Sequence, residues 1–431
     1  MGVKQLFYLC TLLLVIGSNA VLDGRGYAAG QAKPVHAMLD VRLCTSLPIG
    51  LPSYLQLSQG IDNSVMLATE QWKTRFQAAH LALLPPLTLD DAGIGRLDPK
   101  REEQNAKACI GRHDIFGFVG PLNSGDTFTS EPILNRAAML QINPANTNAS
   151  LTSPVTRKTL EPATFNHRLA YPTFYRLVTT DLLQGPADAA FIRQTLHAHG
   201  YFLVDEPGDY ESGVAGEAQA YGTKIGLQLV GMAHIEGNSP SMIAASADRV
   251  ADIVAAKQPD AVFCGCATPD LGAAFASPLR RRGYSGPLVG PDALLSADFI
   301  TLAGSGAGNS YASNEGLDPA GASKAFRNAY RWRFHVHLQF YDAPAYDAAN
   351  INLYGIYMAA THGTLRGSLF QMRAAILPYV AHVRWHGATG TTSFDRNGDN
   401  RHIVISMYGT RNGKWVFVGI APQVRGVSPT G

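Results

Sequence analysis

The sequence predicts an α/β fold in which two doubly wound parallel-sheet lobes, joined by three hinge crossings, follow an N-terminal signal peptide. Short apolar runs alternate with helical patterns, which is typical of parallel sheets covered by helices on both faces. The alternation is interrupted at three places. The chain has 431 residues, of which 46% are hydrophobic, and this is enough for two sizeable cores.

The N-terminus is typical of an export signal. Lys4 precedes the apolar run 6–16, and small residues follow it. The run is too short to span a bilayer comfortably. We therefore predict a signal peptide over residues 1–29, cleaved after Ala20 or near Ala28 and Ala29, with a retained anchor as the alternative. Export makes the periplasm the expected compartment.

The predicted strands are short apolar runs bounded by turn residues. They cover residues 38–44, 80–87, 115–119, 201–205, 227–235, 261–266 and 287–292. A helix is expected over 246–258, because Val250, Ile253 and Val254 form an apolar stripe at helical spacing. Another is expected to end at Gly200, just before the next strand.

The three interruptions define the predicted lobes. They lie in residues 175–186, in the Gly/Ser/Asn/Pro-rich stretch 309–321, and near 393–409. The N-terminal lobe is predicted to comprise residues 30–177 plus 314–398. The C-terminal lobe is predicted to comprise residues 178–313 plus 399–431.

Composition limits the partners. The formal net charge is +2 and 16% of residues are charged, which argues against nucleic acid as the main partner. Four cysteines follow the signal: Cys44, Cys109, Cys264 and Cys266. In an exported chain they could oxidise, but the sequence leaves their pairing open. For Cys264 and Cys266, which are two apart in a predicted strand, buried thiols or one disulfide are favoured over a metal site.

The stretch 114–128 indicates a binding site. A buried run, 115–119, stops at Gly120-Pro121, and Asn123-Ser124-Gly125 then begin a helical pattern. A helix N-terminus at the carboxyl end of a strand offers unpaired N–H groups to a carboxylate or phosphate. The alternative is that Asn123 or Ser124 only caps the helix.

Seven motifs in order carry a family resemblance. They are "GFVGPLNSGDTFTSEPILNRAAMLQINPANTNASLT", "FYRLVTTDLLQGPADAAFI", "LVDEPGDYESGVA", "QPDAVFCGCATPDLGAAF", "LVGPDALLSADFITLAG", "YDAANI" and "FDRNGD". Together they resemble the branched-chain amino-acid-binding proteins of ABC importers, which have the type I periplasmic-binding fold. The resemblance spans roughly residues 35–420.

The resemblance implies a clamp that closes on a free amino acid. Ser124, the backbone at Ala145 and the hydroxyl of Thr147 would hold the ligand's α-carboxylate, which accepts hydrogen bonds from such groups. Asp292 would hold its α-ammonium group. Tyr210 would cover the ligand from the second lobe, and Tyr54 is a looser aromatic candidate.

Departures from the family pattern leave the ligand open. The family usually has Glu where this chain has Asp292, and often an aromatic pair where it has Ala267-Thr268. The side-chain pocket is therefore expected to be reshaped. Amides, urea and aromatic acids are carried by relatives with the same fold, so they remain alternatives to an amino acid.

No enzyme motif emerges from the sequence. Neither a nucleophile elbow, nor His-Glu-x-x-His, nor a Walker loop is present. We expect no catalytic residue, cofactor or metal. The expected function is that of a monomeric solute-binding protein that delivers its ligand to an ABC permease in the inner membrane. The alternative is a sensor module of the same fold that reports to a receptor or kinase.

Overall fold

The structure, a computed structural model, describes residues 38–94, 96–152, 169–206, 209–237, 239–266 and 268–424, with only the backbone for 209–212. The predicted signal peptide, residues 1–29, lies outside the described residues. Among the helices that are described, none is long and apolar enough to cross a membrane.

The first sheet has six strands, and all of its pairings are parallel. Its order is β2-β1-β4-β5-β6, and β3 also pairs with β1. The strands are β1 Leu39–Leu47, β2 Leu81–Leu83, β3 Leu87–Asp90, β4 Ile115–Val119, β5 Leu140–Asn143 and β6 Phe174–Arg176. A separate antiparallel hairpin consists of β12 Trp385–Gly387 and β13 Gly390–Thr392.

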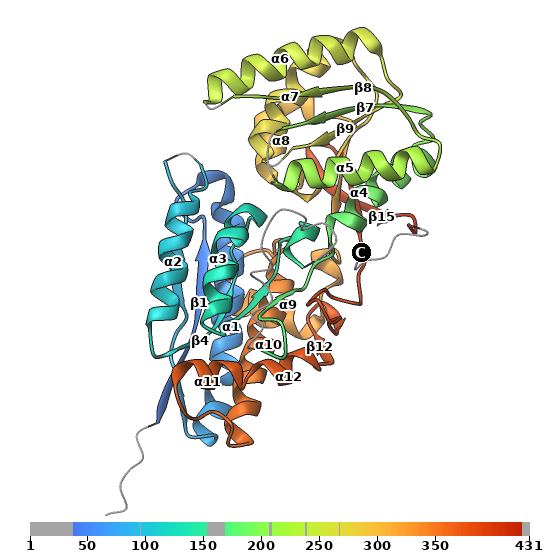
Figure 1. The fold of residues 1–431 in the computed structure, drawn as a ribbon. Helices are drawn as coiled ribbons and strands as arrows, with labels where there is room; N and C mark the ends of the chain where they lie inside the picture. The colour runs from blue at the N-terminus through green and yellow to red at the C-terminus, as the bar shows by residue number, and fades with distance from the viewer. Residues whose placement is uncertain are drawn as a thin grey trace, which may run out of the picture. The chain divides into compact units, whose positions relative to one another are not determined.

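Helices cover both faces of this sheet (Figure 1). Val41 and Leu43 of β1 pack in one core with α1, α10 and α12, whereas Cys44 and Phe118 pack in another with α2 and α3. Side chains alternate between the faces of a strand, so two cores mean a doubly wound sheet. The helices are α1 Leu55–Ala78, α2 Pro99–Gly111, α3 Ser124–Arg136, α9 Lys324–Phe334, α10 Asp342–Thr361, α11 Leu369–Ala374 and α12 Leu377–Ala381.

The second sheet has seven strands in the order β15-β14-β11-β10-β9-β7-β8. Pairings from β8 to β11 are parallel, whereas β14 and β15 are antiparallel. The strands are β7 Gly200–Asp205, β8 Gln228–His234, β9 Ala261–Gly265, β10 Leu288–Gly290, β11 Ser310–Asn314, β14 Ser406–Arg411 and β15 Lys414–Ile420.

This sheet also has a core on each face. Phe202 and Val204 of β7 pack with α6, α7 and α8, whereas Tyr201 and Leu203 pack with α4 and α5. Figure 1 shows α6 and α5 on opposite sides of β7 and β8. The helices are α4 Asp181–Ala190, α5 Asp209–Lys224, α6 Pro240–Lys257, α7 Pro269–Arg281 and α8 Ala297–Ala303.

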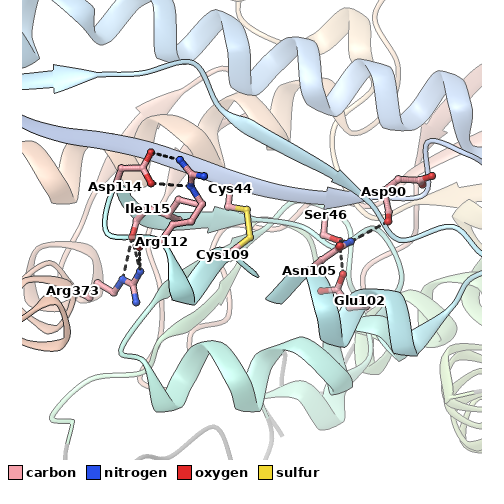
Figure 2. The surroundings of a disulfide bond; sticks show 10 residues. All are labelled: Cys44, Ser46, Asp90, Glu102, Asn105, Cys109, Arg112, Asp114, Ile115 and Arg373. Atoms are coloured by element: carbon pink, nitrogen blue, oxygen red, sulfur yellow. Dashed lines mark hydrogen bonds and ion pairs between the residues drawn. A yellow bond between two sulfur atoms is a disulfide. The ribbon is translucent and has the colours of Figure 1, made fainter. Parts of the chain in front are cut away.

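Disulfides join both cysteine pairs. Cys44 on β1 is bonded to Cys109 on α2, with 6.2 Å between the Cα atoms, and Cys264 is bonded to Cys266 at the end of β9. Figure 2 shows the Cys44–Cys109 bond beneath β1. The first pair fixes α2 against the sheet.

The predicted fold class is confirmed, and three details of the prediction are wrong. β11, Ser310–Asn314, is an inner strand inside a stretch that the composition indicated as a break. The helix expected to end at Gly200 is α-helical only to Ala190 and ends in a π-helical turn, Phe191–Thr195. Ile253 is 46% exposed and does not belong to the buried stripe of α6. The lobe boundaries stay a prediction.

Candidate functional site

One cavity brings together five of the six predicted site residues. Its volume is about 60 Å³. Its lining comprises Tyr54, Leu57, Leu122, Asn123, Ser124, Ala145, Thr147, Pro269, Asp292, Ala293, Leu295, Ser296 and Tyr341. The sixth, Tyr210, lies in α5, and its side chain is outside the described part of the chain. The first-lobe candidates and Asp292 thus face a common space.

The chain enters the site where β4 ends. Gly120 has a φ of 111°, and a Cβ there would lie 2.8 Å from the carbonyl oxygen of Ser46. Only glycine combines this conformation with this approach. Its turn sends the chain across the carboxyl end of the sheet into α3.

The start of α3 settles which residue caps it. The side chain of Asn123 accepts from the N–H of Gly125 at 2.7 Å, so Asn123 is the N-cap. Ser124 is the first helical residue and is 3% exposed. Its hydroxyl accepts from the N–H of Asn148 at 3.4 Å. The capping alternative therefore holds for Asn123, and the hydroxyl of Ser124 lines the cavity.

A buried side chain shapes the loop after β5. Oδ1 of Asn143 accepts from the N–H groups of Ala145 and Asn146 at 2.8 and 2.7 Å. Its Nδ2 donates to the carbonyl oxygen of Pro121 at 2.8 Å. Asn143 thus holds the two cavity-lining turns together, and the N–H of Ala145 is already engaged within the protein.

Arg176 supports the same loop from below. This fully buried side chain donates from Nη1 to the carbonyl oxygens of Asn146 and Asn148, at 2.9 and 3.0 Å. Its Nε forms an ion pair with Asp399 at 2.8 Å, and its Nη2 donates to Thr152 at 2.8 Å. The loop that presents Thr147 is therefore anchored by a buried charge pair.

Asp292 is held in place by two donors. It begins a short 3-10 helix, Asp292–Leu294, directly after β10. Nε2 of Gln184 donates to Oδ1 at 2.7 Å, and the hydroxyl of Tyr341 donates to Oδ2 at 2.6 Å. These bonds fix the orientation of the carboxylate in the cavity wall.

Further buried carboxyl groups lie behind Asp292. Burial raises the pKa of Asp181 to about 7, and the charge of Asp292 adds to this rise. Burial and then the charge of Asp292 raise the pKa of Glu315 well above its usual value. The pKa of Asp188 is raised for the same two reasons. Its Oδ2 accepts a hydrogen bond from the hydroxyl of Ser313 at 3.1 Å. A raised pKa favours the neutral form of each of these carboxyl groups, and the charge of Asp292 contributes to all three rises.

The cavity suits a small zwitterion. The described residues that line it include no Lys, Arg or His. A ligand carboxylate would therefore meet hydroxyl groups and the N-terminus of α3, a 13-residue helix. The carboxylate of Asp292 is the complement for a cation. Over the described ranges, no group of three His, Cys, Asp or Glu side chains could hold a metal ion.

Sequence reasoning missed the residues that orient the site. Tyr341 immediately precedes α10 and Gln184 lies in α4; both lie within or near motifs that carry the resemblance, but neither is assigned a role by it. Arg176 lies in the lobe-crossing motif and is likewise unassigned. An arginine in an apolar stretch is the one signal that could have indicated a buried ion pair.

Comparisons with known proteins agree with this geometry. A family described as "Periplasmic binding protein" matches residues 89–411. No curated protein sequence matches the chain significantly. Among solved structures, a leucine binding protein from Thermotoga maritima is 18% identical, with a TM-score of 0.71 over 88% of this chain and 98% of that one.

Two further structures show the same fold. A branched-chain amino acid transporter substrate binding protein from Streptococcus pneumoniae, in complex with isoleucine, is 17% identical, with a TM-score of 0.68 over 89% of this chain and all of that one. A solute binding protein from R. palustris, in complex with benzoate, is 14% identical, with a TM-score of 0.70 over 90% and 98%. The resemblance carried by the sequence motifs is confirmed.

Proposed function

The chain belongs to the periplasmic binding protein family, and we propose that it is an exported solute-binding protein of an ABC importer. Its ligand is a small α-amino acid, captured in the cavity between Ser124 and Asp292 and delivered to a membrane permease. It works by binding and closure, without catalysis. The structural neighbours that carry isoleucine or benzoate support a small organic solute.

One observation carries this proposal: a single cavity has neutral donors on one wall and a fixed carboxylate on the other. Ser124 and Thr147 offer hydroxyl groups to the α-carboxylate. Asp292 offers its carboxylate to the α-ammonium group. The backbone at Ala145 is the third group proposed for the α-carboxylate, and its N–H, which donates to Asn143, would exchange that bond on ligand binding.

The cavity must open to admit such a ligand. A volume of about 60 Å³ has room for only a few water molecules. We propose that the lobes, residues 30–177 plus 314–398 and 178–313 plus 399–431, separate by rotation at the crossings and close around the ligand. Contacts made only in the closed state would drive closure. Tyr210 would cover the ligand there.

Calorimetric titration tests the proposal. The protein without residues 1–29 would be unfolded, stripped of bound solute, refolded, and titrated with leucine, isoleucine, valine, phenylalanine, urea, short amides and benzoate-type acids. Micromolar or tighter binding of an α-amino acid supports the proposal. Binding only of urea, amides or aromatic acids would remove the ammonium role of Asp292. Binding of none would contradict the ligand class.

A further inference from the structure

A second and larger cavity lies at the crossings between the two sheets. Its volume is about 330 Å³, which falls within the range of small-molecule sites. Its described lining comprises Leu177, Val178, Glu315, Gly316, Leu317, Asp318, Pro319, Ala322, Phe340, Ala343, Pro344, Thr389, Thr391, Asn400, His402, Ile403 and Val404. None of these residues lines the Ser124–Asp292 cavity.

All three chain segments that run between the sheets contribute to this hinge cavity. Residues 177–178 follow β6, residues 315–319 follow β11, and residues 400–404 precede β14. The remaining walls come from the start of α10 and from the β12–β13 hairpin. Most of the lining is apolar, so the cavity can bury the body of an organic molecule.

The polar groups of the hinge cavity are already oriented. Asp318 accepts from the hydroxyl of Tyr408 at 2.6 Å and from the N–H of Ala320 at 2.9 Å. Asn400 donates to the carbonyl oxygen of Leu177 at 3.0 Å and accepts from the N–H of His402 at 3.1 Å. Such prior bonding lowers the entropy cost of holding a ligand.

Acidic side chains outnumber basic ones in the described lining of this cavity. Glu315 and Asp318 line it, its described lining contains no Lys or Arg, and the basic side chain that does line it, His402, is exposed. Glu315 is 1% exposed, so its carboxyl group has little access to water. Burial raises the pKa of Glu315 and favours its neutral form, whereas an ammonium group beside the carboxyl oxygens would favour the ionised form and offset the cost of its burial.

We propose that the hinge cavity is a second binding site, and that its ligand is a small organic amine with an apolar body. The apolar walls take the body, and the acidic pair Glu315 and Asp318 takes the ammonium group. This site shares no lining residue with the proposed amino-acid site, although the charge of Asp292 acts on Glu315.

The test uses 2-phenylethylamine as the probe, with 2-phenylethanol and phenylacetate as its neutral and anionic counterparts. Calorimetric titration of the signal-free protein is expected to show saturable amine binding, weaker binding of the alcohol and none of the acid. No saturable amine binding at millimolar concentration, or equal binding of all three probes, would overturn the proposal.

Variants locate the bound amine. Ala343→Leu fills the hinge cavity, and Leu57→Trp fills the other cavity as its matched control. We expect Ala343→Leu to abolish amine binding and Leu57→Trp to leave it intact. The reverse pattern would place the amine in the Ser124–Asp292 cavity and overturn the proposal.

A charge variant tests the chemical class. Glu315→Gln keeps the side-chain shape, and we expect it to weaken amine binding roughly tenfold while binding of 2-phenylethanol stays unchanged. Thermal unfolding of each variant checks that it is folded, and a crystal structure with the amine serves in place of any variant that is not. Unchanged amine affinity in Glu315→Gln, or an amine seen elsewhere in the crystal, would contradict the assignment.

Discussion

At the scale of single residues, the site is built from short polar side chains held by buried partners. Ser124 and Thr147 line a cavity in which Asp292 is fixed by Gln184 and Tyr341. The buried side chain of Asn143 holds the loop beside them. Five of the six residues expected from the family pattern line the cavity. They do not include the donors that orient Asp292, because their function depends on contacts distant in sequence: Tyr341 is 49 positions from Asp292.

The Ser124→Ala variant tests whether the hydroxyl of Ser124 binds the ligand's α-carboxylate. We expect it to weaken amino-acid binding by about 1–2 kcal/mol, because one hydrogen bond is lost while backbone N–H groups at the α3 terminus remain. The measurement is the calorimetric affinity of the tightest amino acid in the panel. Ser130→Ala, which removes a buried hydroxyl from the same helix outside the cavity lining, is the control. An equal loss in both variants would contradict the specific role of Ser124.

Asp91 should make stability depend on pH. It is fully buried, and burial, followed by the charges of Asp126 and Asp90, raises its pKa to about 8. In an unfolded chain this pKa is about 3.9. Between these values the folded state keeps a proton that the unfolded state has lost. The stability contributed by neutral Asp91 is therefore present below pH 4 and is lost as pH rises toward 8.

We accordingly compare the unfolding free energy of Asp91→Asn with that of the wild type at each pH. We expect this difference to favour the variant more at pH 8 than at pH 5, by more than about 1 kcal/mol. Urea unfolding at the two pH values measures this difference. Asp40→Asn, at an exposed position, is the control and should show no such change. A pH dependence of stability that is the same in wild-type and Asp91→Asn protein would refute the explanation.

At the scale of elements, the disulfide between β1 and α2 should be a major stabilising link. Cys44 and Cys109 are 65 residues apart, and closing a loop of this length in the unfolded chain corresponds to about 4 kcal/mol. We expect the double variant Cys44→Ala/Cys109→Ala to lose stability of that order in denaturant unfolding. The pair Cys264 and Cys266, only two residues apart, closes a minimal loop, and its removal should cost less. A larger loss from the second pair would contradict the loop-closure account.

Arg176 is the last residue of β6. Its side chain bonds to the loop that carries Thr147 and forms an ion pair with Asp399, which precedes β14. Replacing it with Met leaves Asp399 buried without its ion-pair partner, so we expect a loss of about 3–5 kcal/mol in unfolding free energy. Arg333→Ala breaks the exposed ion pair with Glu70 and should cost much less, because solvent screens such pairs. Equal effects of the two substitutions would show that Arg176 is not a buried anchor.

The sequence predicts elements well where composition and burial agree. β4, β7 and β9 are buried and apolar, and each was expected from its apolar run. β11 was missed because its sequence, SYASN, is polar although all but one of its residues are buried. Its polar side chains have partners at distant positions: Ser313, for example, bonds to Gln184 and Asp188. Sequence periodicity cannot show such partners.

At the scale of the whole molecule, the account requires two sheets whose connecting segments can bend. The cavity of about 60 Å³ is smaller than an amino acid, and the proposed function therefore couples binding to movement at the crossings. The larger hinge cavity lies at those same crossings. Its occupation by an amine is a separate proposal, and the variants Ala343→Leu and Leu57→Trp distinguish its failure from a failure at the amino-acid site.

The central claim is that Asp292 binds the ammonium group of an amino acid. It is tested most directly by titrating wild-type protein and the Asp292→Ala variant with the tightest amino acid of the panel and with its des-amino analogue; for leucine, this is 4-methylpentanoate. We expect Asp292→Ala to weaken amino-acid binding by roughly 2–4 kcal/mol and to leave binding of the analogue unchanged or stronger. Wild-type affinity of the variant for the amino acid, or an equal loss for both ligands, would contradict the claim.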